Sequence, residues 1–354
     1  MMRDSHLTFN SMFRDFHQNN WSPEIEHELQ RLLQIAIAED TDIIGDLTSH
    51  ALISEQLHGS ASIRSREDGV MAGIQAVAVI LQAISPTLHW QPLIADGSPI
   101  SAGDKIGQIN GQLQSMLMAE RLVLNLLGKL SGIATLTQKY VEAVAGTPAK
   151  IYDTRKTTLG WRRLEKYAVR CGGGRNHRTG LFDAVLIKDN HLAIGQSNSG
   201  HFTPAEAVIQ TREFFRLHPN SFHFERLPEY SLEYPKDSLD YPKDSPEDSK
   251  DSPEDENQFV PFIPIIEIEV DTLEQLQEVL RVKPDIVLLD NMLLPQLIQA
   301  VEIRNRLAPD VELEASGGIN LKTVGAVATT GVERISVGAL THSAIALDFG
   351  LDWE

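Results

Sequence analysis

The second half of the chain alternates short apolar runs with helical patterns, and this rhythm restricts the fold more than any other feature of the sequence. Because parallel strands need long crossover connections, the alternation predicts a parallel sheet with helices outside it, either closed as a barrel or left open. Six clear strands do not by themselves establish a full eight-stranded barrel. The runs that predict strands are 151–153, 184–187, 265–270, 286–289, 312–315 and 335–337, and helical patterns lie at 272–281, 295–307 and 321–328.

The first half of the chain has a different pattern, which predicts an α+β domain with an antiparallel sheet. Ser22-Pro23 indicates the start of a helix, because Ser is a favoured N-cap residue and Pro fits the first turn. Short extended runs across 59–73 and 88–113 are interrupted by turn signals such as Asp96-Gly97.

These patterns divide the chain into an extension and two domains. We expect a flexible extension over residues 1–22, an N-terminal α+β sandwich domain over 23–132 and an α/β barrel domain over 133–354. The apolar stretch 116–144 predicts a long helix between the domains, which Gly128 or Gly132 could break.

One segment interrupts the rhythm of the second half. Residues 225–257 are rich in Pro, Ser and carboxylates, and the unit 234–238 (Tyr-Pro-Lys-Asp-Ser) recurs at 241–245. Residues 225–256 hold twelve Asp and Glu against four Arg and Lys, a net charge of −8. Such a segment buries too little apolar surface to offset its ordering entropy. We interpret it as a disordered acidic insertion, more plausibly a tolerated loop expansion than a partner-binding tail.

Composition limits the compartment and the partners. The chain has 354 residues, a formal net charge of −18 and 42% hydrophobic residues, enough for a sizeable core. No apolar run reaches the ~18 residues that span a bilayer, and the first twenty residues do not resemble a signal peptide. Cys171 is the only cysteine, so an internal disulfide is excluded. We expect a cytoplasmic protein that binds neither membrane nor nucleic acid.

A basic segment lies inside this acidic chain. Residues 153–191 carry nine Arg and Lys against four carboxylates, and Gly172-Gly173-Gly174 lies in the middle. A concentrated cationic patch on an acidic protein favours a small, multiply anionic ligand over a nucleic acid. Arg162, Arg163 and Lys166, with Arg170 a turn later, have the spacing of a solvated, salt-bridged helix face instead.

Polar and charged residues follow or interrupt the predicted strands. In a barrel the carboxyl ends of the strands face one active-site rim, so these residues are expected to converge there. They are Arg155, Lys156, Lys188, Asp189, His191, Glu267 or Glu269, Asp290 and Asn291. Carboxylates in apolar strands are costly unless they are paired or bound to a metal ion, and a buried ion pair without catalytic role remains an alternative for each.

The last two predicted strands end in glycine. Ser316-Gly317-Gly318 and Gly338-Ala339 occupy the positions at which barrels often bind phosphate through backbone N–H groups. The ligand inferred from these residues is a phosphorylated molecule plus a second anion held by Arg and Lys, with carboxylates that could bind a divalent cation. Phosphoribosyl diphosphate with a carboxylated acceptor fits this set.

Taken together, the motifs resemble the quinolinate phosphoribosyltransferase family, also called nicotinate-nucleotide pyrophosphorylases (carboxylating). The resemblance covers about residues 24 to 345, interrupted by the insertion. The matching motifs are Glu39-Asp40, 45–49 (Gly-Asp-Leu-Thr-Ser), Glu120-Arg121, Asn125-Leu126, 131–135 (Ser-Gly-Ile-Ala-Thr), 153–157 (Asp-Thr-Arg-Lys-Thr), 172–178 (Gly-Gly-Gly-Arg-Asn-His-Arg), 188–191 (Lys-Asp-Asn-His), 267–271 (Glu-Ile-Glu-Val-Asp), 289–291 (Leu-Asp-Asn), 314–319 (Glu-Ala-Ser-Gly-Gly-Ile) and 336–341 (Ser-Val-Gly-Ala-Leu-Thr).

The resemblance implies an enzyme of NAD synthesis that joins quinolinate to phosphoribosyl diphosphate and releases diphosphate and carbon dioxide to leave nicotinate mononucleotide. The implied fold is an N-terminal α/β sandwich joined to an incomplete, TIM-like barrel of seven strands. The implied assembly is a homodimer, with a higher oligomer left open.

The resemblance also assigns site residues. Quinolinate would be held by Thr154, Arg155, His177, Arg178 and Lys188, with Arg121 reaching in from a neighbouring subunit. Phosphoribosyl diphosphate would contact Lys156, Glu269, Asp290, Ser316, Gly317, Gly318, Val337, Gly338 and Ala339. The implied catalytic residues are Glu269, Asp290, Lys156 and Lys188, and Mg²⁺ would bridge the phosphates, with Glu269 and Asp290 as its candidate protein ligands. For His177, orientation of a carboxylate and a structural hydrogen bond both remain open.

Two other interpretations remain at this point. A related phosphoribosyltransferase could use a different acceptor, although 176–178 (Asn-His-Arg) with Lys188 favours a dicarboxylate. A non-catalytic sensor or nucleic-acid binder could use the same basic patch, which the acidic balance of the chain disfavours.

Overall fold

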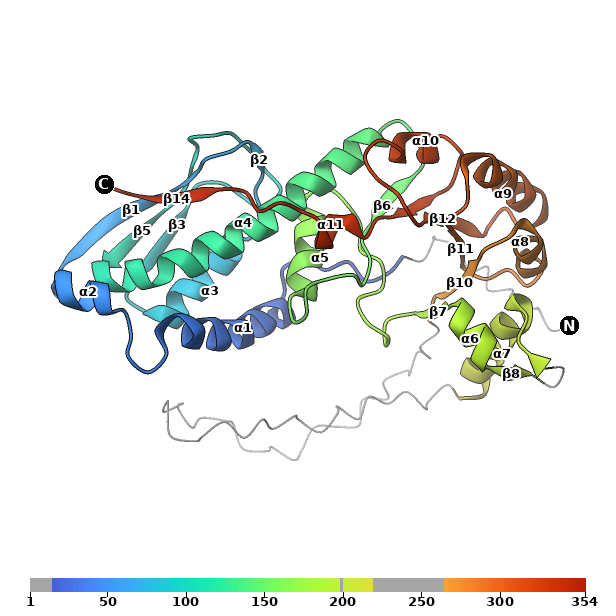
Figure 1. Ribbon diagram of the computed structural model, residues 1–354, viewed down its shortest axis with the longest axis horizontal. Coiled ribbons are helices and arrows are strands. Elements are labelled where there is room, and N and C mark those ends of the chain that lie inside the picture. Colours follow the sequence, from blue (N-terminus) through green and yellow to red (C-terminus); the bar gives the residue numbers. More distant parts are fainter. Residues whose placement is uncertain (1–14, 198–199, 219–263) are drawn as a thin grey trace, which may run out of the picture.

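The structure is a computed structural model that describes residues 15–197, 200–218 and 264–354. Figure 1 shows two bodies side by side, an antiparallel sheet with its helices at one end and a parallel sheet with its helices at the other, with helix α4 running between them. The predicted insertion at 225–257 and the first fourteen residues of the predicted extension lie outside the described residues.

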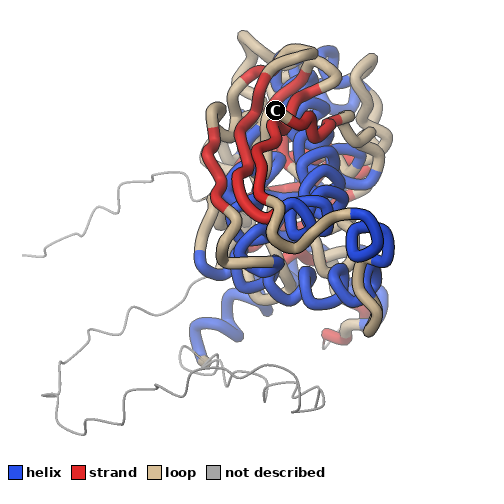
Figure 2. Tube along the Cα trace, turned by 90° about the vertical axis from the view of Figure 1, so that its left-hand side faces the viewer, coloured by secondary structure: helices blue, strands red, loops and turns tan. Residues whose placement is uncertain are grey.

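The N-terminal body is an antiparallel sheet covered by helices. Its strand order is β14-β1-β5-β3, and Figure 2 shows these strands on one side of the body with helices behind them. The strands are β1 (His58–Ser65), β3 (His89–Pro92), β5 (Lys105–Gln112) and β14 (Phe349–Trp353), and the principal helices are α1 (Pro23–Thr41), α3 (Ile74–Ile84) and α4 (Leu113–Ala143). A small sheet of β2 (Gly69–Val70) and β4 (Pro99–Ile100) and helix α2 (Leu47–Leu52) complete it.

The last strand of the chain belongs to this first sheet. Strand β14 pairs antiparallel with β1, in a register that places Ala61 opposite Trp353 and Ser65 opposite Phe349. The assignment of all residues of 133–354 to the barrel is therefore wrong for 349–353. The physical reason is that β1 offers an open edge, which the returning chain end covers.

Helix α4 is continuous, and the expected break at Gly128 or Gly132 does not occur. It spans Leu113–Ala143, a length of 31 residues. A Cβ at Gly132 would lie 2.0 Å from the carbonyl oxygen of Ile345, and one at Gly128 would lie 2.6 Å from that of Leu347. These glycines therefore serve close packing of the C-terminal segment on the helix.

The C-terminal body is a parallel sheet in the order β6-β13-β12-β11-β10-β7. Beyond β6, Arg175 forms an isolated parallel bridge with Tyr152, and no seventh strand joins this sheet among the described residues. The strands are β6 (Lys150–Tyr152), β7 (Val185–Ile187), β10 (Ile266–Val270), β11 (Ile286–Asp290), β12 (Glu312–Ser316) and β13 (Arg334–Ser336). All six predicted strand positions are confirmed.

Helices connect and cover these strands, as expected for parallel crossovers. They are α5 (Arg162–Cys171), α6 (Asp189–Ile194), α7 (Pro204–Leu217), α8 (Leu273–Leu280), α9 (Leu294–Leu307), α10 (Val324–Ala328) and α11 (Ala339–His342), and a short hairpin of β8 (Gln196–Ser197) and β9 (Gly200–His201) follows α6. Within the described ranges, no helix has the length and apolar character needed to cross a membrane.

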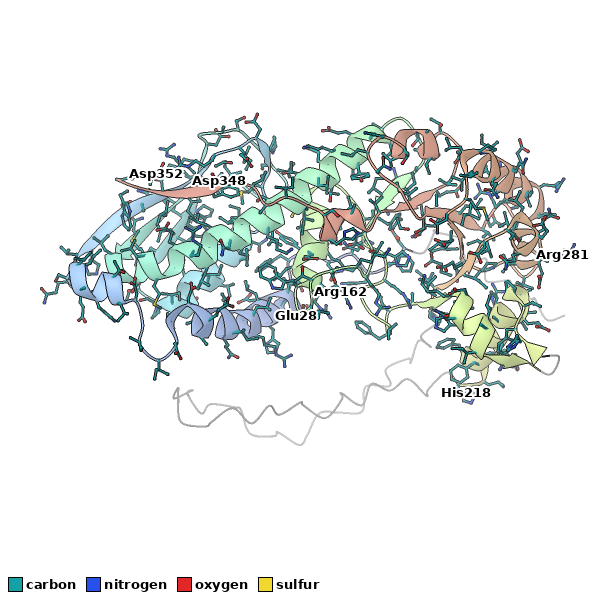
Figure 3. All side chains as sticks on the ribbon, in the orientation of Figure 1. Glu28, Arg162, His218, Arg281, Asp348 and Asp352 are labelled. Carbon is teal, nitrogen blue, oxygen red and sulfur yellow. The ribbon has the colours of Figure 1, made fainter. Side chains whose placement is uncertain are left out.

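Two expectations about charged and terminal residues need correction. Residues 15–22 are not a flexible extension, because Phe16 and Asn19 are buried. Helix α5 is not simply a solvated charged face, because Lys166 is fully buried in an ion pair with Asp153. Arg163 reaches across to Glu28 of α1 at 2.7 Å. Figure 3 labels Glu28 and the neighbouring Arg162 at this junction of the two bodies.

Candidate active site

A cavity of about 870 Å³ opens at the carboxyl ends of the parallel strands. This is the rim where barrels of this type carry their functional groups. The predicted site residues that line it are Thr154, Arg155, Lys156, His177, Arg178, Lys188, Glu269, Asp290, Ser316, Gly317, Gly318, Val337, Gly338 and Ala339. Arg121 is not among the lining residues and lies exposed on α4. Asp189 and His191, which were also expected at this rim, do not line the cavity either.

Two guanidinium groups face one side of the cavity. Both Arg155 and Arg178 have a buried Nε atom without a hydrogen-bond partner among the described residues. Burial lowers the pKa of Arg178, and the like charge of Arg155 lowers it further. The Arg178 Nη1 atom donates to the carbonyl of Ala184 at 3.2 Å. Adjacent cations that repel each other and keep unused donors are suited to bind an anion with more than one carboxylate.

Carboxylates also line the cavity. The sequence left open whether Glu267 or Glu269 reaches the site, and Glu269 lines the cavity. Glu269 is paired with Lys188, whose side chain is 42% exposed. Burial raises the pKa of Glu269, Lys188 opposes that rise, and the nearby Asp290 adds to it. A cation and two carboxylates thus meet where β7, β10 and β11 end.

The glycines after β12 allow a close approach of backbone. Asn291 has φ of 53°, and its N–H donates to the carbonyl of Ser316 at 2.9 Å. A Cβ at Gly317 would lie 2.2 Å from the Asn291 Oδ1 atom, and φ of Gly317 is 91°. Only glycine fits this turn, which brings two strand ends into contact at the rim.

A buried cluster of His177, Glu267 and Glu314 borders the cavity. The His177 Nε2 atom is 2.9 Å from a carboxylate oxygen of Glu267 and 3.6 Å from one of Glu314. Burial raises the pKa of Glu314 to about 7, and the charge of Glu267 contributes to the rise. Glu314 is therefore still partly protonated near neutral pH.

These three side chains also have the spacing of metal ligands, but the tautomer of His177 opposes that role. The Arg178 N–H donates to His177 Nδ1 at 2.8 Å, so Nδ1 carries a lone pair. The ring proton then resides on Nε2, the atom that faces the carboxylates. A metal ion would need the Nε2 lone pair, so we interpret the cluster as a proton-holding site. Both ring nitrogens are thus engaged by the protein, which favours the structural alternative for His177.

A second buried network holds the loop that carries His177 and Arg178. Asp153 accepts from the His177 N–H at 2.9 Å and from the Asn176 Nδ2 atom at 2.7 Å. Lys166, paired with Asp153, donates to the His177 carbonyl at 2.9 Å. Lys166 of α5 and Asp153, which directly follows β6, therefore hold the loop that carries His177 and Arg178.

Several lining residues were not predicted as site residues. They are Leu186, Leu288, Glu314, Ile319, Ser336 and His342, whereas Asn291 was expected at the rim and does line the cavity. Side chains of a strand alternate between its faces, so residues two positions before a predicted rim residue share its direction. Counting back from Lys188, Asp290 and Ser316 gives Leu186, Leu288 and Glu314. His342 lies on α11, and the sequence offers no comparable signal for it.

Together, the parallel barrel and a rim of cations, carboxylates and glycine amides define a class of enzymes that act on small phosphorylated and carboxylated molecules. Comparison with known families is more specific. The model described as "Quinolinate phosphoribosyl transferase, N-terminal domain" matches residues 46–131, and the model of the C-terminal domain matches 133–215 and 248–352. The chain belongs to the quinolinate phosphoribosyltransferase family. The C-terminal match omits 216–247, which contain most of the predicted insertion.

Individual relatives cover most of the chain. A nicotinate-nucleotide pyrophosphorylase (carboxylating) of Mycobacterium leprae is 36% identical over 319 residues, which are 90% of this chain and 94% of the relative. Quinolinate phosphoribosyltransferase (decarboxylating) 1 of Nicotiana glauca is 34% identical over 340 residues, 92% of this chain and 82% of the relative. The solved nicotinate-nucleotide pyrophosphorylase of Francisella tularensis superposes with a TM-score of 0.76 at 31% identity, covering 96% of this chain and all of that one.

Proposed function

We propose that this chain transfers the phosphoribosyl group of phosphoribosyl diphosphate to quinolinate with loss of carbon dioxide. The products are nicotinate mononucleotide, diphosphate and carbon dioxide, and the step belongs to NAD biosynthesis. Membership of the family and the names of its relatives support this reaction. The single observation that carries it is the pair Arg155 and Arg178, two crowded guanidiniums with unused buried donors at one cavity wall.

The dicarboxylate would bind at the cationic wall. Arg155 and Arg178 present planar forks that match carboxylates, and Lys188 adds a point charge. Thr154 offers a hydroxyl at the same strand end. His177 would act from below, by fixing the backbone of Arg178, because both of its ring nitrogens already contact protein groups.

Phosphoribosyl diphosphate would bind at the glycine-bearing turns of the cavity. Lys156 and the glycine-bearing turns at 316–318 and 337–339 line this part. Backbone N–H groups in tight turns and at the start of a helix bind phosphate without a side chain. Gly338 packs against Lys156, since a Cβ there would lie 3.1 Å from the lysine Cδ.

We also propose that Mg²⁺ accompanies the diphosphate. Glu269 and Asp290 supply carboxylate oxygens at one edge of the cavity, and Mg²⁺ prefers oxygen ligands from carboxylates and phosphates. When bound, the cation would neutralise charge on the leaving diphosphate. Burial is the main cause of the raised pKa of Glu269, and the nearby charge of Asp290 adds to it, which fits a pair of carboxylates that takes up a cation.

The reaction follows from these charges. As the bond between the ribose anomeric carbon and diphosphate breaks, positive charge develops on the sugar, and Glu269 and Asp290 can stabilise it. The ring nitrogen of quinolinate donates its electron pair to that carbon. The ring becomes cationic, so the carboxylate beside the nitrogen can leave as carbon dioxide, and the ring carbon then takes up a proton. The cations of Arg155, Arg178 and Lys156 offset the repulsion between two anionic substrates.

The proposed assembly is a homodimer in which Arg121 completes the site of the partner. Arg121 is exposed on α4 and lies outside the cavity of its own chain. Large apolar side chains are exposed on the loops near the cationic wall, Leu159 at 89%, Leu181 at 73% and Phe182 at 55%, and a second copy would cover them. We further propose a cytoplasmic location, which suits the unpaired Cys171.

The decisive experiment is to mix purified protein with quinolinate, phosphoribosyl diphosphate and Mg²⁺ and to detect nicotinate mononucleotide by mass. Nicotinate, which lacks the second carboxylate, is the matched control acceptor. We expect product from quinolinate only. Product from nicotinate but not from quinolinate would contradict the proposal and favour a related transferase with another acceptor.

A further inference from the structure

The segment Asp15–Asn19 packs against the loop 175–179, about 160 positions further along the chain. This loop carries His177 and Arg178 to the cavity. Phe16 and Asn19 are both buried, at 4% and 2% exposure. The contact is therefore part of the folded interior.

Backbone and side-chain hydrogen bonds join the two segments. The Gln18 side-chain amide donates to the Asn176 carbonyl at 3.1 Å and accepts from the Asn176 N–H at 3.0 Å. It thus pairs with both backbone groups of one residue, as a neighbouring strand would. The Asn19 N–H donates to Asn176 Oδ1 at 2.7 Å, and Asn19 Nδ2 donates to Thr179 Oγ1 at 3.1 Å. These bonds fix the loop on both sides of His177.

Phe16 and Asp15 extend the contact to the ring of His177 and the foot of the barrel. The Phe16 ring stacks on the His177 ring with centroids 4.4 Å apart and an angle of 28°. Asp15 binds Arg175 at 2.6 Å and Arg334 at 3.1 Å. The His177 ring is therefore held at three places. Nδ1 accepts from the Arg178 N–H, Nε2 faces Glu267, and Phe16 covers one face of the ring.

We propose that residues Asp15–Asn19 form a clamp, made of positioning residues, that holds the 175–179 loop so that Arg178 meets the carboxylates of the substrate. This inference rests on the proposed function, because the loop that the clamp holds carries Arg178, which is proposed to bind the carboxylates of quinolinate. None of the clamp residues lines the cavity, so they act through Asn176, His177 and Arg175. Sites that bind rigid anions depend on such supporting contacts, because small displacements of a charged fork weaken binding strongly.

The test uses the full chain with Gln18→Ala and, separately, Phe16→Leu. Gln18→Ala removes both hydrogen bonds to Asn176 but no apolar core, and Phe16→Leu keeps apolar volume while removing the stacked ring. Gln108→Ala is the matched control, since Gln108 is also half-buried and hydrogen-bonded but lies on β5 of the other body. The measurements are calorimetric quinolinate affinity, steady-state kinetics with each substrate and thermal unfolding.

We expect each clamp variant to raise the quinolinate Kd and KM about tenfold or more. The KM for phosphoribosyl diphosphate should stay unchanged, and Gln108→Ala should match the unaltered chain. A lower melting temperature with unchanged quinolinate affinity would overturn the proposal, because it would show a structural role alone. If Phe16→Leu does not fold, Gln18→Ala decides. Lack of product from the unaltered chain would instead overturn the proposed function. The clamp would then be tested by comparing the calorimetric quinolinate affinity of the clamp variants with that of the unaltered chain.

Discussion

Arg155 and Arg178 combine a functional benefit with a structural cost. Their like charges repel, and each retains a buried donor without a partner. We expect Arg155→Ala to lower kcat/KM for quinolinate roughly hundredfold or more, because it removes a charged hydrogen-bonding partner from a desolvated anion. The free energy of unfolding should not fall, since the repulsion is relieved. Steady-state kinetics and chemical denaturation check both parts.

Two further variants sharpen that test. Arg155→Lys keeps the charge but loses the planar fork, so it should recover only part of the activity. Arg281→Ala is the control, because Arg281 is exposed at the end of α8, and Figure 3 labels it at the far end of the barrel body. Full activity in Arg155→Ala would contradict the assignment of the cationic wall.

Glu314 makes the stability of the fold depend on pH. Its pKa rises from the usual 4.5 to about 7 through burial and the charge of Glu267. The folded state then holds a proton that the unfolded state has lost, so this group's contribution to stability falls as pH rises from about 4.5 to about 7. We expect Glu314→Gln to gain stability relative to the unaltered chain over this window, by up to about 3 kcal/mol. Denaturation at pH 5 and pH 8 measures the difference, and parallel curves would contradict it.

Single residues differ in how far the sequence alone could place them. Arg155, Lys188 and Asp290 were predictable, because each follows an apolar run that had to be a strand. Glu314 was not predicted, but it sits two positions before Ser316, and the alternation of side chains along a strand could have identified it. The surroundings of Lys166 could not be predicted, since helical spacing fits both a solvated face and a buried pair. Its partner Asp153 lies on a different element, and only the packed fold joins them.

At the scale of elements, strand and helix positions were well predicted, and long-range pairing was not. Strand β11 at Ile286–Asp290 was expected at 286–289. A short apolar run of this length, bounded by turn signals, is typical of a buried strand. Strand β14 went unpredicted although Phe349, Leu351 and Trp353 alternate. Its partner β1 lies nearly the whole chain away, and no local pattern encodes that pairing.

The contact between α4 and the C-terminal segment gives a prediction with an unusual sign. Replacing Gly by Ala inside a helix normally stabilises it by about 0.5–1 kcal/mol. At Gly132 the added Cβ would meet the Ile345 carbonyl at 2.0 Å, so we expect Gly132→Ala to destabilise the protein by about 1–3 kcal/mol instead. Gly128→Ala, with 2.6 Å to the Leu347 carbonyl, should cost less. Thermal unfolding of both variants checks the order, and stabilisation at Gly132 would contradict the packing.

At the scale of the whole molecule, the proposed homodimer would place Arg121 of each chain in the cavity of its partner. Arg121 is exposed on α4, away from the cations of its own cavity. In a symmetric dimer each contact between the two chains occurs twice. If Arg121 of one chain reaches the cavity of its partner, Arg121 of the partner reaches the cavity of the first chain. This arrangement would complete both cationic walls and cover the apolar loops at Leu159 and Leu181.

Mixing two inactive variants tests this arrangement. Arg121→Ala and Arg155→Ala should each be nearly inactive alone. When the two are co-expressed in equal amounts, half of the dimers are mixed, and each mixed dimer has one site with both arginines, so we expect about a quarter of full activity. If Arg121 served its own chain, every site in a mixed dimer would lack one arginine and activity would not return. Arg155→Ala with Arg178→Ala is the matched control, because both lesions lie in one cavity and no mixed dimer can contain an intact site.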